Sequence, residues 1–350
     1  MDFSGDDGGA GAMTILDTRN AWAAQLGGER GVALIAVLWM FIFLFVVAFE
    51  FSTAAREEAS AAYRFHEETE GYYLALAGFE RGLYDFLNQQ SGAGPIPAAK
   101  TDLLDGAWRE QQLGAGTYRV RFVDESGKIN LNRANEATLQ RVFTNLGMDA
   151  ARRDVLVDAM LDWRDPDDLH RVNGAENEYY AALTPPYTAK NGAFDSVADL
   201  LWIKGMTGEI FYGEAPPAGR GSEQPRRVGL RDIFTVDSAI DRVNLRTASP
   251  EVIHALTGIA LERCRTFVEE RKKLSEKTLG DLLPLLGVGS GDPAMQMFIF
   301  TNPSVVSVEA EGRAQESGVR RRLHGVVRLG GARGFELMRW LDRAPALPSD

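Results

Sequence analysis

One stretch of the sequence gathers side chains that could bind a metal ion. It runs from Met160 to Tyr180 and reads MLDWRDPDDLHRVNGAENEYY. Oxygen ligands clustered on a loop suit a hard cation such as Ca²⁺, although the spacing here is not that of an EF-hand. The alternative is a solvated loop in which Asp165 and Pro166 make a turn and cap a helix. The candidate ligands are Asp162, Asp165, Asp167, Asp168, Glu176 and Glu178.

The sequence offers little support for other chemistry. His170 lies in the same stretch, but no second histidine or cysteine is near enough to complete a transition-metal site. We find no G-x-S-x-G motif, no Walker loop and no dinucleotide-binding glycine motif. The single cysteine, Cys264, is expected to be a small buried apolar residue. We therefore predict that the chain is not an enzyme.

The longest apolar run indicates a membrane anchor. From Val32 to Phe49 no side chain is charged or polar, and Glu50 ends the run. This length reaches the threshold for a membrane-spanning helix and exceeds the apolar core of a signal peptide. A buried core helix would keep a polar face, which this run lacks. A membrane span over 32–49 is the leading interpretation.

The anchor is expected to continue into a long amphipathic helix over 32–90. No proline interrupts the chain between Val32 and Asn88, whereas residues 1–31 are rich in glycine, alanine and aspartate and are expected to be unstructured. An apolar stripe along the outer half predicts that one face packs on a domain. The stripe consists of Ala55, Ala59, Ala62, Phe65, Leu76, Phe79, Leu83 and Phe86.

Four later segments have the pattern of β-strands. GTYRVRFVDE, from Gly116, alternates apolar and polar residues. The segments SVVSVEAEGRA from Ser304, VRRRLHGVVRLG from Val319 and FELMRWLD from Phe335 are joined by turn-forming residues, which predicts an antiparallel meander. Residues 128–300 between them are mainly helical in pattern. We therefore predict an α+β fold, in which a sheet domain formed by 91–127 and 301–343 is interrupted by an α-domain at 128–300, with a tail at 344–350.

An internal repeat marks the helical region. KINLNRANEATLQRVF from Lys128 and RVNLRTASPEVIHAL from Arg242 align at an offset of 114 residues. In each copy a helix and a Gly-apolar turn follow, which is the outline of a helix-hairpin-helix or SAM-like unit. Such turns can grip a phosphate through backbone amides, but Asp149 would repel it. The net charge of −11 also argues against a general nucleic-acid-binding protein.

Three motifs in order resemble one protein family. Arg30 and Gly31 followed by VALIAVLWM look like the prepilin cleavage site of type IV pilin-like proteins. Together with DESGKINLN from Asp124 and DWRDPDD…NGAENEYY from Asp162, they resemble the K-type minor pseudopilin of bacterial type II secretion systems (GspK). The resemblance implies a pilin-like core, a prepilin leader at 1–31, cleavage between Gly31 and Val32, and N-methylation of Val32.

The same resemblance implies partners and a location. The partners would be the I-type and J-type minor pseudopilins at the tip of the pseudopilus, other pseudopilins, the inner-membrane assembly platform and the prepilin peptidase, but no nucleic acid. The chain would cross the inner membrane once, with a cytoplasmic N-terminus and a periplasmic C-terminal domain. Family members bind Ca²⁺ in the α-domain, so a structural Ca²⁺ is expected. The alternative is a pilin-like DNA-binding protein of a competence or type IV pilus system.

The fifth residue after the expected cleavage site is Ala36, where pilins commonly carry glutamate. A carboxylate inside an apolar helix bundle is costly unless it is paired, and in assembling pilins its partner is the free amine of the subunit ahead. A subunit with nothing ahead of it has no such amine. Ala36 therefore predicts a position at the tip. The alternative is that Ala36 is an ordinary membrane residue of a bitopic protein.

Overall fold

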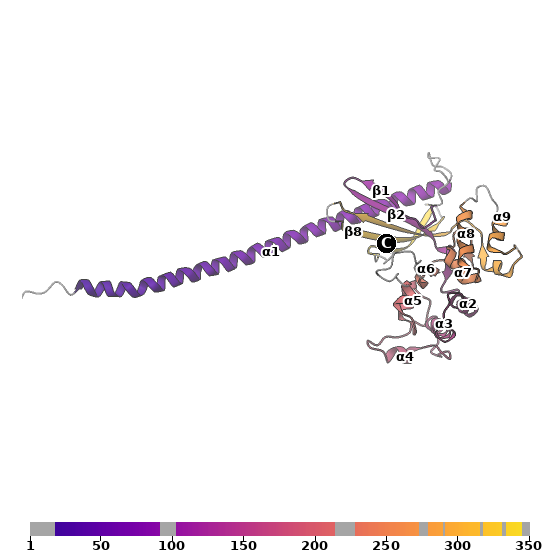
Figure 1. Cartoon of the computed structure of the whole chain (residues 1–350), viewed down its shortest axis with the longest axis horizontal. Helices are drawn as coiled ribbons and strands as arrows, with labels where there is room; N and C mark the ends of the chain where they lie inside the picture. The colour runs from indigo at the N-terminus through magenta and orange to yellow at the C-terminus, as the bar shows by residue number, and fades with distance from the viewer. Residues whose placement is uncertain are drawn as a thin grey trace, which may run out of the picture. The chain divides into compact units, whose positions relative to one another are not determined.

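The computed structural model describes residues 18–91, 103–213, 228–272, 279–289, 291–315, 318–330 and 334–344. The chain forms two compact units, Met1–His66 and Glu67–Asp350. Figure 1 shows the helices and strands along the chain. The N-terminal part of the predicted leader, residues 1–17, and most of the predicted tail lie outside the described residues.

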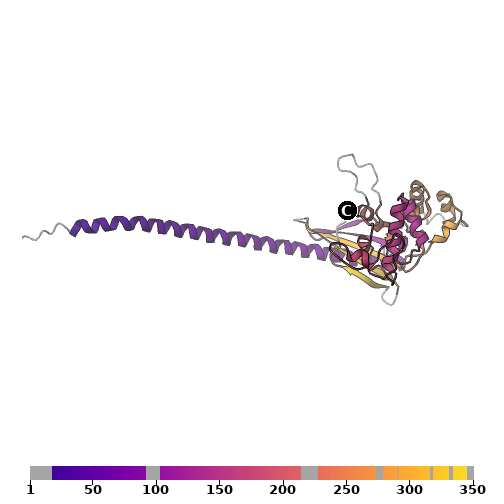
Figure 2. The ribbon, with the colours of Figure 1, turned by 90° about the horizontal axis from the view of Figure 1, so that it is seen from below.

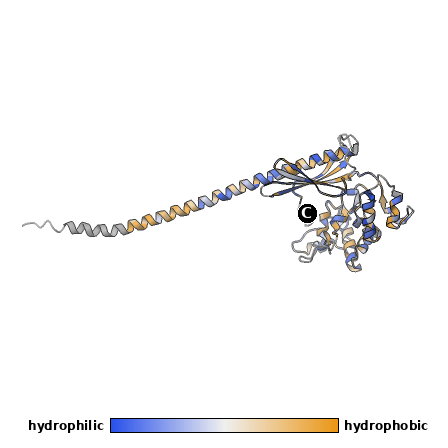
Figure 3. Cartoon of the chain, turned by 45° about the horizontal axis from the view of Figure 1, so that its top comes forward, coloured by the Kyte–Doolittle hydropathy of each residue, from blue (hydrophilic) through white to orange (hydrophobic). Residues whose placement is uncertain are grey.

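The N-terminal helix α1 spans Thr18–Ser91 without a break over its 74 residues. It therefore starts before Val32, and the prediction that residues 1–31 are unstructured is wrong for 18–31. Alanine, leucine, glutamine and arginine in that segment favour helix, and extending an existing helix avoids the cost of nucleation. Its apolar run, visible as the orange stretch in Figure 3, makes α1 long and apolar enough to cross a membrane, by length and composition.

In the second unit, the C-terminal part of α1 packs on the sheet. Within the second unit Ala75, Phe79, Leu83 and Phe86 are buried. In the first unit Phe65 and the three alanines of the predicted stripe are exposed. The predicted stripe is therefore correct for Phe79, Leu83 and Phe86, which are buried. It is wrong for its members before His66, which are exposed, because an alanine-rich pattern does not reveal where burial stops.

The sheet has five antiparallel strands in the order β1-β2-β7-β8-β9. The predicted antiparallel meander of the last three strands, β7, β8 and β9, is confirmed. The earlier predicted strand, β2, belongs to the same sheet and pairs with β7. β1 was not predicted, because REQQL has no apolar alternation and forms a strand only through its two-residue hairpin to β2. The bounds are β1 Arg109–Leu113, β2 Gly116–Asp124, β7 Val305–Arg313, β8 Arg320–Leu329 and β9 Phe335–Leu341.

Close packing of α1 on β2 depends on two helix glycines. A Cβ on Gly78 would lie 2.6 Å from Cδ2 of Tyr118, and a Cβ on Gly82 would lie 3.0 Å from the ring of Phe122. Phe86 also stacks on Phe122, with ring centroids 5.2 Å apart. The glycines that weaken the helix in isolation therefore let it approach the sheet closely.

Helices interrupt the sheet between β2 and β7 and have their own apolar core. In Figures 1 and 2 this helical region lies at one end of the sheet. Its elements are the helices α2 Glu136–Asn145, α3 Ala150–Arg164, α4 Asn177–Ala181, α5 Gly208–Tyr212, α6 Leu230–Ile233, α7 Pro250–Thr257, α8 Leu261–Arg271 and α9 Leu279–Leu286. The short 3-10 helices are η1 Glu125–Gly127, η2 Val197–Trp202 and η3 Pro293–Met297. The two-residue strands are β3 Ile129–Asn130, β4 Phe234–Thr235, β5 Val243–Asn244 and β6 Phe298–Ile299.

The internal repeat is present in the hydrogen bonds of the helical region. β3 pairs in parallel with β4, and β5 pairs in parallel with β6. The guanidinium of Arg164 donates to the carbonyl oxygens of Leu131 and Ala134, at 2.7 and 2.6 Å. Arg271 does the same to Leu245 and Ala248, at 2.7 and 2.8 Å. Each copy is therefore closed by an arginine at the end of its second helix.

Candidate functional site

The acidic stretch forms the loop between α3 and α4, and Asp162 organises it. Asp162 is fully buried at the end of α3. Its carboxylate accepts the backbone N–H of Arg171, at 3.1 Å to Oδ2. A Cβ on Gly174 would lie 1.8 Å from Oδ2, so the loop passes directly over this carboxylate. Asp162 therefore has a structural role in addition to being a candidate ligand.

Two residues outside the predicted set also close the loop. Asp158 lies one helical turn before Asp162, and its Oδ2 accepts both the backbone and the side-chain N–H of Asn173 at 3.0 Å. The ammonium of Lys204 donates to the carbonyl oxygens of Asn173 and Gly174, at 3.0 and 2.9 Å. The i, i+4 spacing of Asp158 and Asp162 could have revealed the first contact. Lys204 is distant in sequence, so no local pattern predicts it.

Glu176 and Asp165 carry the carboxylate oxygens that these contacts leave unsatisfied. Glu176 is 4% exposed, and both of its carboxylate oxygens are buried without a hydrogen-bond partner, as is Oδ1 of Asp165. Burial, together with the nearby carboxylates led by Asp162, raises the pKa of Glu176 to about 7. Burial also raises the pKa of Asp165. A cation beside these oxygens would compensate for both the lost hydration and the mutual repulsion.

The other predicted ligands differ in their surroundings. Asp168 accepts side-chain N–H groups from Asn177 and Asn191, at 2.7 and 2.9 Å. Asp167 accepts a backbone N–H two residues further on, and Glu178 is exposed on α4. Among the described residues, no group of three histidine, cysteine, aspartate or glutamate side chains is arranged to hold one metal ion. The chemistry of Glu176 and Asp165 nevertheless fits a hard cation, and Ca²⁺ remains a prediction.

The predicted cleavage site lies within α1. Gly31 and Val32 are helical, and Val32 and Ala36 begin the exposed apolar segment. None of the residues of the apolar segment 32–49 is buried. The prediction of a membrane-spanning segment is consistent with this exposure, whereas cleavage and methylation stay predictions.

The helix-hairpin-helix turns carry carboxylates where a phosphate would bind. Asp149 caps α3, and its Oδ1 accepts the backbone N–H of Arg152 at 3.0 Å. Glu262 lies in the first turn of α8. The two copies of the internal repeat also contact each other, since the side-chain amide of Asn145 donates to the carbonyl oxygen of Ala255 at 2.9 Å. The turns therefore suit helix packing better than phosphate binding.

The DESGK segment joins the sheet to the helical region through buried polar contacts. The carboxylate of Glu125 accepts the hydroxyl of Ser307 at 2.5 Å, the hydroxyl of Thr235, and the ammonium of Lys128 at 3.0 Å. Burial alone would raise the pKa of Glu125, but Lys128 and the two hydroxyl groups hold it below its ordinary value. Glu125 is therefore a buried, paired carboxylate that fixes the junction between the two regions.

Comparison with solved structures shows which known fold this architecture resembles. The chain is similar in fold to a chain of a structure described as "The Crystal Structure of the GspK-GspI-GspJ complex from enterotoxigenic Escherichia coli Type 2 Secretion System". The TM-score is 0.53 at 14% identity, and the match covers 83% of this chain and 100% of that chain. At this identity the likeness concerns the fold: a long N-terminal helix on an antiparallel sheet with added helices.

Sequence comparisons find similarity to one family. The sequence profile described as "Type II secretion system (T2SS), protein K" matches residues 121–216. Type II secretion system protein K of Klebsiella pneumoniae is 27% identical over 54% of this chain and 61% of its own length. The Pseudomonas aeruginosa protein of the same name is 29% identical over 51% of this chain and 58% of its own length.

The matched segment 121–216 lies in strand β2 and the first part of the helical insertion, and in sequence the chain is similar to the type II secretion system protein K family. The chain spans about three fifths of the length of these curated relatives. The family is one of secretion-system components, which agrees with the prediction that the chain is not an enzyme.

Proposed function

We propose that this chain is a minor pseudopilin that caps the tip of the type II secretion pseudopilus. The prepilin peptidase would cut between Gly31 and Val32 and the new terminal amine of Val32 would be methylated. The single observation that carries the proposal is the continuity of α1, in which the apolar segment after Gly31 runs without a break into the helix that packs on the sheet. A subunit of this kind is anchored by residues 32–49 and then extracted into a filament by the same helix.

The role is structural, in initiating the pseudopilus and supporting protein export across the outer membrane. The helical insertion adds bulk to the sheet domain, which suits a terminal position better than one inside a filament. Before assembly the chain crosses the inner membrane once, with its second unit in the periplasm. The solved relative was crystallised with GspI and GspJ, and we take the I-type and J-type minor pseudopilins of the same system as the partners. The inner-membrane assembly platform and other pseudopilins would be further partners.

Co-purification tests this proposal. The full-length chain is co-expressed in bacterial membranes with the I-type and J-type minor pseudopilins of its own system and is purified through an affinity tag. We expect the three proteins to elute together in a fixed ratio. Failure of both partners to bind the wild-type chain would contradict the proposal, and salt-dependent DNA binding by the purified chain would favour the competence alternative.

We further propose that Ca²⁺ binds at the acidic loop. Glu176 and Asp165 would hold it through the carboxylate oxygens that have no partner within the described residues, and Asp162, Asp167 and Asp168 would add negative charge nearby. When bound, the ion would neutralise these carboxylates and fix the loop between α3 and α4. Its role is structural, because the site lies in a loop that the chain already closes through Asp158 and Lys204.

A further inference from the structure

The two edges of the sheet differ in character. The outer edge of β1 carries the polar residues Glu110, Gln111 and Gln112. β9 exposes the large apolar side chains of Leu337 and Met338, and no strand of the described residues pairs with its outer edge. Proteins normally cover or block an apolar edge strand, because its open backbone groups recruit another strand. Among the described residues no strand covers β9 and β9 contains no proline, although its pairing with β8 shifts register between Val326 and Val327.

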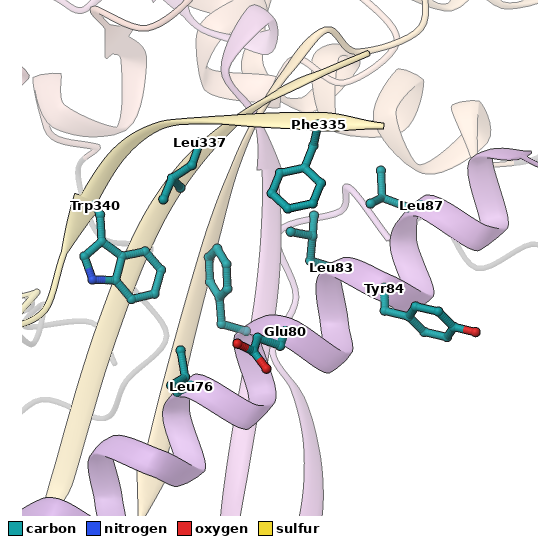
Figure 4. Close-up of a pocket in the computed structure, with 9 residues that line it drawn as sticks. Leu76, Glu80, Leu83, Tyr84, Leu87, Phe335, Leu337 and Trp340 are labelled. Carbon is teal, nitrogen blue, oxygen red and sulfur yellow. The ribbon is translucent and has the colours of Figure 1, made fainter. Parts of the chain in front are cut away.

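The C-terminal part of α1 and strand β9 line one groove. Phe79 and Leu83 are buried against the strands. Leu76, Glu80, Tyr84 and Leu87 follow at intervals of four, four and three residues and form the neighbouring face of the helix. These residues and Phe335, Leu337 and Trp340 of β9 line a groove of about 720 Å³. Figure 4 shows the lining side chains, with the ring of Tyr84 directed away from β9.

Side-chain contacts hold Phe79 and Trp340 in place at the floor of the groove. The rings of Phe79 and Trp340 meet edge to face, with centroids 4.9 Å apart, and Trp340 donates through Nε1 to Asp342 at 2.5 Å. The lining is otherwise apolar apart from Glu80 and the hydroxyl of Tyr84. The groove is therefore a formed apolar surface beside an open strand edge.

We infer that an extended strand of a partner pseudopilin adds to β9 as a sixth strand and places alternate apolar side chains in the groove against α1. A strand adjacent to β9 would lie about 4.8 Å from it and would satisfy its open backbone N–H and C=O groups. A helix laid in the groove would cover the apolar side chains but would leave those groups unpaired. The inference rests on the proposed function, because it takes a partner of the tip complex as the source of the strand.

Glu80 defines the chemistry of that strand further. It is the charged residue of the lining, it is exposed, and it forms no ion pair within the described residues. The neighbouring Arg81 is already paired with Asp85, at 3.1 Å between Nε and Oδ2. A lysine or arginine among the alternate apolar residues of the incoming strand would therefore meet Glu80 at the rim of the groove.

Two pairs of matched variants of the full-length chain test the inference in the tip complex. Leu337→Asp places a charge in the groove, and Leu113→Asp places the same charge on β1, where the residue is equally exposed, at 47% against 48%. Glu80→Arg reverses the charge at the rim, and Glu110→Arg makes the same change at the other edge. We expect Leu337→Asp and Glu80→Arg to weaken co-assembly with the partners by about tenfold or more, while both controls leave it unchanged.

Hydrogen exchange separates a strand from other occupants. In the wild-type complex, amides of 335–341 should exchange at least about tenfold more slowly than in the chain alone, and amides of 109–113 should not change. If Leu337→Asp weakens the complex but 335–341 gains no protection, the occupant is not a strand. If the complex forms and neither groove variant weakens it, the groove is not the docking surface, although the proposed function stands. If the wild-type chain binds neither partner, the proposed function itself fails.

Discussion

At Glu176 the fold holds a carboxyl group where ionisation is opposed by burial and by neighbouring carboxylates. Its pKa of about 7 in the folded chain exceeds its ordinary value of 4.5, so the folded state binds this proton more tightly than the unfolded state. Without Ca²⁺, the stability that comes from this proton is present below pH 4.5 and is lost as the pH rises through 7. The acidic loop is thus a source of instability at neutral pH when no cation is bound.

The first prediction concerns this pH dependence. In EDTA, Glu176→Gln should raise the Tm at pH 8 by about 2–4 °C, corresponding to about 1 kcal/mol in a domain of this size. It should also reduce the fall in Tm between pH 5.5 and pH 8, because glutamine does not titrate. Thermal unfolding at both pH values measures this. A lower Tm for the variant at pH 8 would show that Glu176 forms favourable contacts as an ionised group.

The second prediction concerns the cation. At 100 times its dissociation constant, Ca²⁺ should stabilise the wild-type chain by about 2.7 kcal/mol, and Glu176→Gln and Asp165→Ala should abolish this gain. Glu209→Gln, an exposed acid on α5, serves as the matched control and should keep it. Thermal unfolding with and without Ca²⁺ provides the measurement. If the wild-type Tm does not respond to Ca²⁺, the metal proposal is wrong.

At the scale of elements, the repeated units explain how a helical region with short helices is held together. Each unit has a two-residue parallel strand pair, a capped helix and a closing arginine. The repeat was visible in the sequence because its asparagines and leucines align at a constant offset. The closing arginines were not visible in the sequence, because Arg164 and Arg271 are 107 residues apart and not 114. Only the fold brings them to equivalent carbonyl groups.

The third prediction follows from these arginines. Arg164→Met and Arg271→Met should each lower the free energy of unfolding by about 1.5–3 kcal/mol, because each leaves two carbonyl groups without a charged donor. Arg152→Met is the matched control, since Arg152 is 60% exposed and forms only a 3.9 Å ion pair with Asp149. Denaturant unfolding at neutral pH measures all three. Equal losses in the control and the two variants would remove any special role for the closing contacts.

Sequence patterns predicted the helices and strands in which apolar residues recur at regular spacing. They failed where contacts between residues distant in sequence determine the structure. The long helix and strands β2, β7, β8 and β9 were predicted from unbroken helix and from alternation. β1 was missed because its residues are polar and it exists only as a partner of β2. In the acidic loop the stretch itself was recognised, but the distinction between the bonded Asp162 and the unsatisfied Glu176 depends on burial and on Lys204, which local spacing does not encode.

At the scale of the whole molecule, the proposed role combines a membrane helix, a sheet domain and a bulky insertion in one chain. In the proposed role, the helix would supply the anchor before assembly and the contact with a filament afterwards. The helical insertion is tied to the sheet by buried polar contacts: Thr235 donates to Glu125, and the side-chain amide of Asn244 donates to the carboxylate of Asp124 at 2.9 Å. A terminal subunit needs no glutamate to pair with a subunit ahead of it, and Ala36 agrees with such a position.

The fourth prediction tests the terminal position. Ala36→Glu should give no gain in pseudopilus assembly or secretion, because a carboxylate at this point would have no amine ahead of it and would be costly in an apolar bundle. Ala36→Leu, which keeps the site apolar, should leave both unchanged. Secretion assays and filament counts provide the measurement. Cross-links that place the chain in the middle of filaments would exclude a role as the cap.

The central claim is that the chain is a processed pseudopilin, and the N-terminus of the mature protein tests it most directly. The fifth prediction is that the chain purified from bacterial membranes containing its prepilin peptidase begins at Val32, with the sequence VALIA and a methylated terminal amine. Without the peptidase the same chain should keep the residues before Val32. A mature chain that retains its leader in the presence of the peptidase, or that begins at another residue, would contradict the claim.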